Sequence, residues 1–441
     1  MGNVKNKSNK NPQNINEINN NLKQKNLCLS KFHNPFFKHI KTIKNCTFNS
    51  FEIYQLKNIY RNEKDKIFYL ALASEKEEII NIYKYSYKDN RYVKITSINT
   101  YLIDIPQIIL KYFYNPLNNK EYLFIVKCHD NIFDDIEIYL IKKEKEYVLI
   151  NKKQNLLNQF EEDLRSSIHY TSYIKSFDIF YNKYENNIYI ITAYFLGEIR
   201  DNNFDSYSEN FINIKIYQNL NSNPSTIKDV SFTTNNFNNN TFNIIYEDKL
   251  SQKYYIIIYD DSIIEFIEIN KNLIQDKIQI SKIINIQDEI GLENYFFLDI
   301  NKNYKNSCII NNDNRDYLYI SYEETVEINI DENEVKDEEK YKYMSHLMII
   351  DLLTREFVKK LDLNIRVNFM LNWNNKYLIL ISENSFYIFD ININKIISKS
   401  LDKYLKIDKT KKISSIKTLL SIEDSFYALF ILKENLDIYF C

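Results

Sequence analysis

A two-segment unit recurs seven times along the 441-residue chain, and this recurrence limits the folds that the chain can adopt. Each unit is an apolar segment, an acidic turn and a second apolar segment. The clearest copy is KYLILISENSFYIFD, at residues 376–390. One such unit cannot bury its apolar faces alone, so the recurrence predicts stacked repeats that share a core.

The apolar segments have the composition of β-strands. The chain contains 37 Tyr and 28 Phe, and Ile is abundant throughout. Aromatic and β-branched side chains suit a pleated sheet, and segments apolar almost without alternation suit strands buried on both faces. The first segments lie at 66–74, 121–129, 187–196, 253–260, 316–324, 376–383 and 425–433, and their partners at 79–85, 135–141, 211–218, 263–269, 346–351, 385–390 and 436–441.

Weaker strand segments flank these pairs. One precedes each pair, as at 51–56 (FEIYQL) and 366–371 (RVNFML), and another often follows, as at 92–98 (YVKITSI) and 356–363 (EFVKKLDL). Four strands repeated seven times predict an all-β fold, a seven-bladed β-propeller.

The two ends of the chain are predicted to complete one blade. The last unit ends at residue 441 without an outer strand, whereas FFKHIKTIK (36–44) lies before the first complete blade. Pairing these segments would close the ring and remove two exposed edges. We therefore predict a disordered basic tail over residues 1–30 and a propeller over residues 31–441, closed by its N-terminal strand.

Residues 346–363 and 371–401 resemble WD40 repeats. Asp351 and Asp390 stand where the Trp-Asp dipeptide of that family ends the third strand. The resemblance implies a divergent WD40-like propeller that acts as a protein-interaction scaffold; another propeller family is the alternative. The Gly-His pair of the family is missing, because the chain has three glycines. Asn and Asp, which tolerate positive φ, are expected to form the turns instead.

Common catalytic and metal-binding motifs are absent from the sequence. Three glycines cannot supply a dinucleotide or phosphate loop, and HExxH, GxSxG and zinc-spaced Cys/His clusters do not occur. We predict no enzyme activity, no cofactor and no metal site, with catalysis by carboxylates in a central channel as the alternative. Five scattered cysteines, no apolar leader and no run of 18 apolar residues predict a cytoplasmic protein with reduced thiols.

Acidic residues occupy all seven turns inside the repeated units. In a WD40-like ring these turns emerge together, so they predict an acidic face that binds protein partners; ordinary solvated turns are the alternative. The predicted partner-binding residues are Glu75, Asp134, Asp135, Asp201, Asp205, Asp260, Asp261, Glu323, Glu324, Asp331, Glu332, Glu334, Asp337, Glu338, Glu339, Glu383 and Glu434.

The N-terminus predicts a second mode of association. Residues 1–45 carry a net charge of +8 within a chain of −2, which leaves −10 for the remainder. MGNVKNKS resembles an N-myristoylation signal on Gly2, with Asn6 in place of the usual Ser or Thr. Lys5, Lys7 and Lys10 would add attraction to an anionic membrane. The alternative is an Asn/Lys-biased tail that carries no lipid.

Taken together, these features favour a non-catalytic scaffold or adaptor that works with other proteins in a multi-protein complex. The second reading is a peripheral membrane adaptor held by Gly2 and the basic tail. Nucleic acid is not an expected partner, because the body of the chain is acidic. Long insertions around 155–170, 198–210, 222–240, 285–305 and 325–345 are either functional loops or low-complexity filler.

Overall fold

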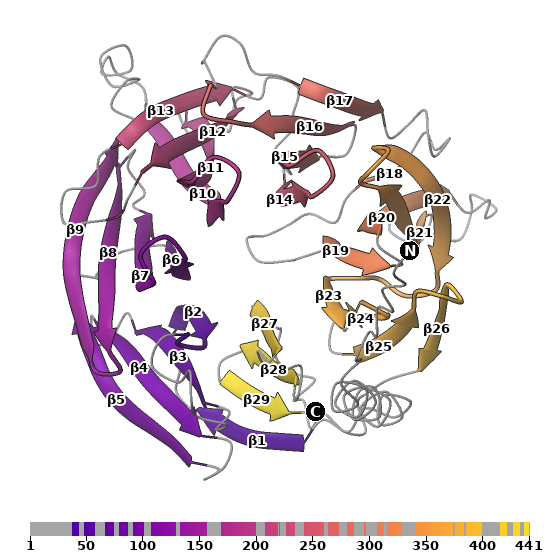
Figure 1. Ribbon diagram of the computed structural model, residues 1–441. Helices are drawn as coiled ribbons and strands as arrows, with labels where there is room; N and C mark the ends of the chain where they lie inside the picture. The colour runs from indigo at the N-terminus through magenta and orange to yellow at the C-terminus, as the bar shows by residue number, and fades with distance from the viewer. Residues whose placement is uncertain are drawn as a thin grey trace, which may run out of the picture.

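The described part of the chain forms a ring of seven antiparallel β-sheets (Figure 1). Strands succeed one another from the centre of the ring to its rim, and each sheet is one blade. The computed structural model describes residues 38–43, 48–57, 67–74, 79–86, 91–100, 107–128, 133–156, 169–199, 208–218, 220, 226–233, 242–259, 263–272, 280–285, 295–296, 307–312, 315–327, 341–373, 375–382, 385–398, 415–420, 427–432 and 436–440.

Blades 1 to 3 follow one another along the chain. Blade 1 contains β2 (Phe48–Tyr54), β3 (Ile67–Ser74), β4 (Ile79–Ser86) and β5 (Arg91–Asn99). Blade 2 contains β6 (Gln107–Asn115), β7 (Lys120–Cys128), β8 (Phe133–Lys143) and β9 (Glu146–Leu156). Blade 3 contains β10 (His169–Asn182), β11 (Asn187–Ile199), β12 (Ser208–Tyr217) and β13 (Thr226–Thr233).

Blades 4 to 6 continue in the same way. Blade 4 contains β14 (Phe242–Asp248), β15 (Lys253–Tyr259), β16 (Ile263–Ile269) and β17 (Ile280–Asn285). Blade 5 contains β18 (Tyr295–Phe296), β19 (Ser307–Asn312), β20 (Arg315–Glu327), β21 (Tyr341–Asp351) and β22 (Glu356–Leu363). Blade 6 contains β23 (Phe369–Trp373), β24 (Tyr377–Ser382), β25 (Ser385–Asp390) and β26 (Lys395–Ser398).

Blade 7 joins the two ends of the chain. Its inner strands are β27 (Ser415–Leu420), β28 (Tyr427–Leu432) and β29 (Leu436–Phe440), and its outer strand is β1 (Lys38–Ile43). In Figure 1 the indigo β1 lies beside the yellow β29. The strands pair antiparallel, and Thr42 Oγ1 donates a hydrogen bond to Asp437 Oδ1 at 2.5 Å. The predicted seven-bladed β-propeller architecture, closed by an N-terminal strand, is confirmed. Residues 1–30, with their predicted disorder, lie outside the described residues.

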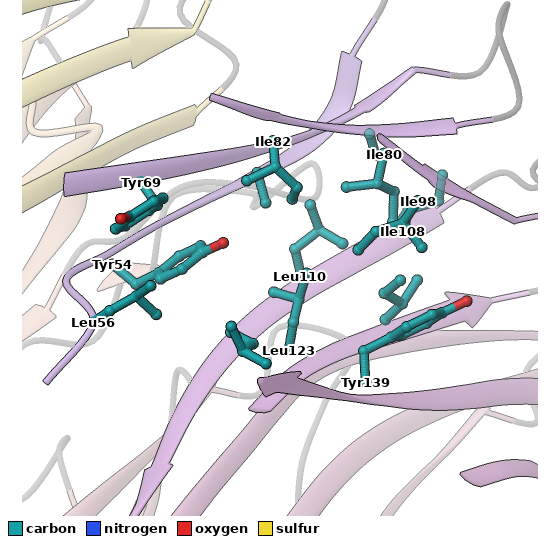
Figure 2. Packing of buried hydrophobic residues seen from close by; sticks show 14 of the residues in the cluster. Tyr54, Leu56, Tyr69, Ile80, Ile82, Ile98, Ile108, Leu110, Leu123 and Tyr139 are labelled. Carbon is teal, nitrogen blue, oxygen red and sulfur yellow. The ribbon is translucent and has the colours of Figure 1, made fainter. Parts of the chain in front are cut away.

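Adjacent blades pack face to face, which explains why the second strand of a blade lacks alternation. On β3, Phe68 and Leu70 belong to the cluster shared with blade 7, whereas Tyr69 and Ala71 belong to the cluster shared with blade 2. Figure 2 shows the latter cluster, with Tyr54 and Tyr69 at one end and Tyr139 at the other. Both faces of such a strand are therefore removed from water. This burial stabilises the fold by roughly 25 cal/mol per Å² of apolar area.

Every outer strand carries one extra residue opposite its partner strand. The bulged residues are Ile40, Ile95, Ile150, Ile227, Ser281, Val358 and Ile397. A bulge raises the local twist and interrupts the row of backbone groups that an edge strand offers to other chains. Because β1 carries the same bulge as the other six, the N-terminal strand is a complete structural equivalent of an outer strand.

Blade 5 departs from the predicted four-strand pattern. The short β18 lies within the predicted insertion at 285–305, and it pairs with β20 at Glu323 and Glu324. The longer β19 pairs with the other end of β20. Two segments thus share the innermost position of this blade, and part of the insertion belongs to the sheet.

Deletion of residues 30–45 is expected to abolish soluble expression, because β29 would lose its partner and Leu436 and Ile438 would be exposed. Soluble yield and circular dichroism measure the effect. Deletion of residues 2–26 is the control and should leave the fold intact. A folded protein lacking residues 30–45 would contradict a structural role for β1.

Candidate interaction surfaces

The turns of the blades emerge on two faces of the ring. Since successive strands are antiparallel, the first and third turns of a blade lie at one end and the second turn at the other. Turns of neighbouring blades are in contact on the first of these faces: the Lys57 amide donates to Glu121, and Tyr184 donates to Glu247. We call the face of the first and third turns the Asx-turn face, and the face of the second turns the acidic-turn face.

Most of the predicted partner-binding residues lie outside the described residues. The backbones of Asp134 and Asp135 lie at the start of β8, and that of Glu324 lies in β20. The residues outside the described ranges are Gly2, Lys5, Lys7, Lys10, Glu75, Asp201, Asp205, Asp260, Asp261, Asp331, Glu332, Glu334, Asp337, Glu338, Glu339, Glu383 and Glu434. Their roles stay predictions.

Glu323 departs from its predicted role on an exposed acidic face. Its side chain is 1% exposed, and one carboxylate oxygen lies 3.0 Å from Arg366 Nε. Burial raises the pKa of Glu323 above its usual range, although Arg366 and a hydrogen bond from Ser345 oppose this. Arg366 lies in the connection from blade 5 to blade 6, so Glu323 fastens that connection instead of meeting solvent.

An ion pair with both side chains buried lies inside blade 2. Lys127 Nζ and Glu137 Oε1 are 2.7 Å apart on the neighbouring strands β7 and β8. The other carboxylate oxygen accepts hydrogen bonds from Thr100 and Tyr139. Burial alone would raise the pKa of Glu137, but these partners outweigh it and lower that pKa. Because Thr100 follows the last strand of blade 1, the network joins two blades.

Side chains of Asn and Asp shape the Asx-turn face. Asn115, Asn182, Asp248, Asp351 and Asp390 each end a strand and accept a hydrogen bond from the backbone amide two residues later, at 2.8–3.0 Å. Such Asx turns hold the chain in a reversal without glycine. Asp351 and Asp390, predicted to mark the end of the third strand, do end β21 and β25.

Residues with positive φ complete these turns. In five turns the residue four positions after the Asx side chain has φ between 53° and 61°. The expectation that Asn replaces glycine is confirmed at three of them, while Gln and Arg occupy the other two. The five residues are Asn119, Asn186, Gln252, Arg355 and Asn394. The sequence signal of these turns is an Asn or Asp followed four positions later by a polar residue, a spacing that the pattern of apolar strands does not reveal.

Charged side chains join neighbouring blades on this face. Arg355 of blade 5 lies 4.2 Å from the Tyr255 ring centroid and 3.7 Å from Asp248, both of blade 4. Lys183 of blade 3 lies 2.6 Å from Glu247 of blade 4. Such pairs fix the relative position of the turns, and cation–π contacts add to the packing.

Among the described residues, a mixed-charge cluster lies on the innermost strands of blades 1 to 3. Lys111 Nζ lies 2.7 Å from Asp178 Oδ1, and Glu52 accepts a hydrogen bond from the Tyr112 amide at 3.2 Å. Burial alone would lower the pKa of Lys111, but Asp178 and Glu52 raise it. A lysine held protonated between two carboxylates is an ion pair between blades and a poor nucleophile.

Two further observations concern metals and membranes. Across the described ranges, no group of three or more His, Cys, Asp or Glu side chains is placed to hold a metal ion. In the same residues, no helix is long and apolar enough to cross a bilayer.

Comparison with known proteins finds solved structures of similar fold but no protein of similar sequence. No family model and no curated protein matches the sequence. Saccharomyces cerevisiae Sqt1 has a TM-score of 0.44 and 9% identity, with 92% of this chain and 100% of Sqt1 covered. The Dos1 propeller has a TM-score of 0.42 and 9% identity, with 85% of this chain and 74% of the Dos1 chain covered. BBS1N in complex with ARL6DN has a TM-score of 0.40 and 10% identity, with 91% of this chain and 93% of that chain covered. The fold rests on the strand pairings and not on these values.

The substitution Lys127→Met is expected to destabilise the protein by up to about 3–5 kcal/mol, because it removes the buried cation of Glu137 and leaves only the half-exposed Lys152, 3.7 Å away. Since the pKa of Glu137 is lowered in the folded protein, its contribution is present above the unfolded pKa and is lost as the pH falls through the folded pKa. Urea unfolding at several pH values measures both effects.

The matched control is Lys142→Met, which removes an ion pair with Glu146 whose partners are both about half exposed. That change should cost less than about 1 kcal/mol. Equal losses of unfolding free energy for Lys127→Met and Lys142→Met would show that the buried network stabilises the protein no more than an exposed ion pair does.

Proposed function

We propose that the protein is a non-catalytic scaffold that presents turns on the faces of its ring to protein partners. The observation that supports this best is that ion pairs among the described residues hold strands and blades of the ring together. Lys127–Glu137 joins two strands of blade 2, and Lys111–Asp178 joins blades 2 and 3. Glu323–Arg366 joins blade 5 to its connection with blade 6. A ring braced in this way holds its turns in fixed positions, which lowers the entropy lost when a partner binds.

The acidic-turn face is the proposed site for a basic protein partner. The connection between β15 and β16 is the shortest turn on this face with adjacent predicted binding residues, Asp260 and Asp261. Several like charges on one face would steer a basic partner and make association sensitive to salt. This proposal extends to the other predicted acidic residues, with the exception of the buried Glu323.

A peripheral membrane adaptor is the second candidate, and the register of β1 favours it. Lys38 lies opposite Phe440, so β1 begins at the end of the blade where β29 finishes, which is the Asx-turn face. The chain that precedes β1 carries Gly2, Lys5, Lys7 and Lys10. A lipid on Gly2 together with these lysines would supply the two signals that stable membrane binding requires.

The double substitution Asp260→Lys/Asp261→Lys is expected to remove one or more partners that co-purify with the wild-type protein, because it reverses the charge of one acidic turn. Quantitative affinity purification with mass spectrometry, at low and high salt, measures the loss. Glu356→Lys reverses an exposed acid on the opposite face and is the control. A partner profile shared by both variants and wild type would contradict the acidic-face proposal.

Gly2→Ala is expected to move the protein from the membrane fraction to the cytosol of the native host, because alanine at this position cannot accept myristate. Cell fractionation and intact mass measure location and modification, and Asn3→Ala is the control. An unmodified wild-type N-terminus would end the lipidation proposal and leave the scaffold proposal in place.

A further inference from the structure

Exposed aliphatic side chains project from the Asx turns of four blades. Leu117 is 39% exposed, Leu250 76%, Leu353 37% and Ile393 56%. The three leucines occupy the same position, two residues after the Asx side chain, and Ile393 lies one residue further. Single exposed aliphatics are ordinary, but their recurrence at the tip of one type of turn places them all on one face.

The other exposed large hydrophobic residues of the described chain are distributed differently. All of them lie on outer strands, around the rim of the ring. They are Val93, Leu149, Ile280, Ile283, Val358 and Ile397. The rim residues therefore provide aliphatic side chains of similar exposure that point away from both faces.

Basic side chains surround the aliphatic turn tips. Within two residues of the described turns on this face, thirteen exposed side chains are Lys or Arg, and Glu356 is the exposed acid. The other acids beside these turns are buried or half-buried, and several bond to turn amides or to lysines, as Asp248 and Glu247 do. The exposed basic residues are Lys57, Arg91, Lys120, Lys142, Lys143, Lys145, Lys183, Lys249, Lys253, Lys271, Arg315, Lys376 and Lys395.

The outer strand of blade 7, β1, begins on this same face. Residues 1–37 contain six lysines and one acid, Glu17, and they precede β1 at its Asx-turn end. The sequence that leads into β1 is therefore basic, as are most of the exposed charged side chains beside the turns on this face.

We infer that the Asx-turn face docks on an anionic lipid bilayer, with Leu117, Leu250, Leu353 and Ile393 entering the interfacial region and the surrounding lysines contacting headgroups. Separated aliphatic tips on different blades suit a planar, deformable surface that each tip can enter independently. Basic residues gain from the negative potential of anionic lipids. A protein interface instead has a contiguous, closely packed apolar centre, which spaced tips framed by lysines do not provide.

This inference goes beyond the scaffold proposal and does not require lipidation of Gly2. The test uses the full-length chain with an N-terminus shown by intact mass to be unmodified. Flotation with phosphatidylcholine vesicles containing 30% phosphatidylserine should recover the protein, and pure phosphatidylcholine vesicles should not. The substitution pair Leu250→Ser/Ile393→Ser should weaken binding about tenfold or more, because it removes the two most exposed apolar tips.

The rim pair Leu149→Ser/Ile283→Ser is the matched control, since these residues are 46% and 50% exposed, and it should bind like wild type. Lys249→Glu/Lys395→Glu should weaken vesicle binding. The remaining binding should decrease less with added salt than the binding of the wild-type protein does. Thermal melts verify that each variant is folded.

Three outcomes would each overturn the inference: no vesicle binding by the wild-type protein, binding by the tip variant equal to that of wild type, or a loss in the rim variant equal to that in the tip variant. Loss of a protein partner in the tip variant without loss of vesicle binding would assign the face to that partner instead.

Discussion

Face-to-face packing of neighbouring sheets is the interaction on which the rest of the structure depends. The second strands of blades 1 to 5, such as β3, give alternate side chains to two different clusters, so these blades have no core of their own. Stability must then come from the closed ring, since a terminal blade without a neighbour would expose one apolar face. Closure by β1 turns an open stack of repeats into a ring whose outer edges are all interrupted by bulges.

Charge has different tasks in different parts of this ring. Among the ion pairs with little or partial exposure, Lys127–Glu137 lies inside blade 2 and Lys111–Asp178 joins blades 2 and 3. On the Asx-turn face, acids are largely withdrawn into turns while lysines extend outward. The division fits a molecule with two chemically different faces, one proposed for basic protein partners and the other for an anionic bilayer.

Several features could be predicted from sequence because they follow from local rules. Apolar segments without alternation located the central strands, and the unmatched segment at 36–44 located β1. The scarcity of glycine correctly led to Asn at positive φ, as at Asn119 and Asn186. The burial of Glu323 does not follow from the sequence, because an acid near a turn is expected to be exposed, and its partner Arg366 comes from the connection to the next blade.

The sequence alone determined the number of blades, the strand order and the use of Asn and Asp in turns, because periodicity, composition and turn chemistry act over a few neighbouring residues. Only the tertiary structure decided which side chains meet across blades and which turns share a face. Leu117, Leu250 and Ile393 are far apart in the chain, and it is the common orientation of the blades that gathers them. Burial and proximity between distant segments depend on the closed ring, and no local pattern encodes them.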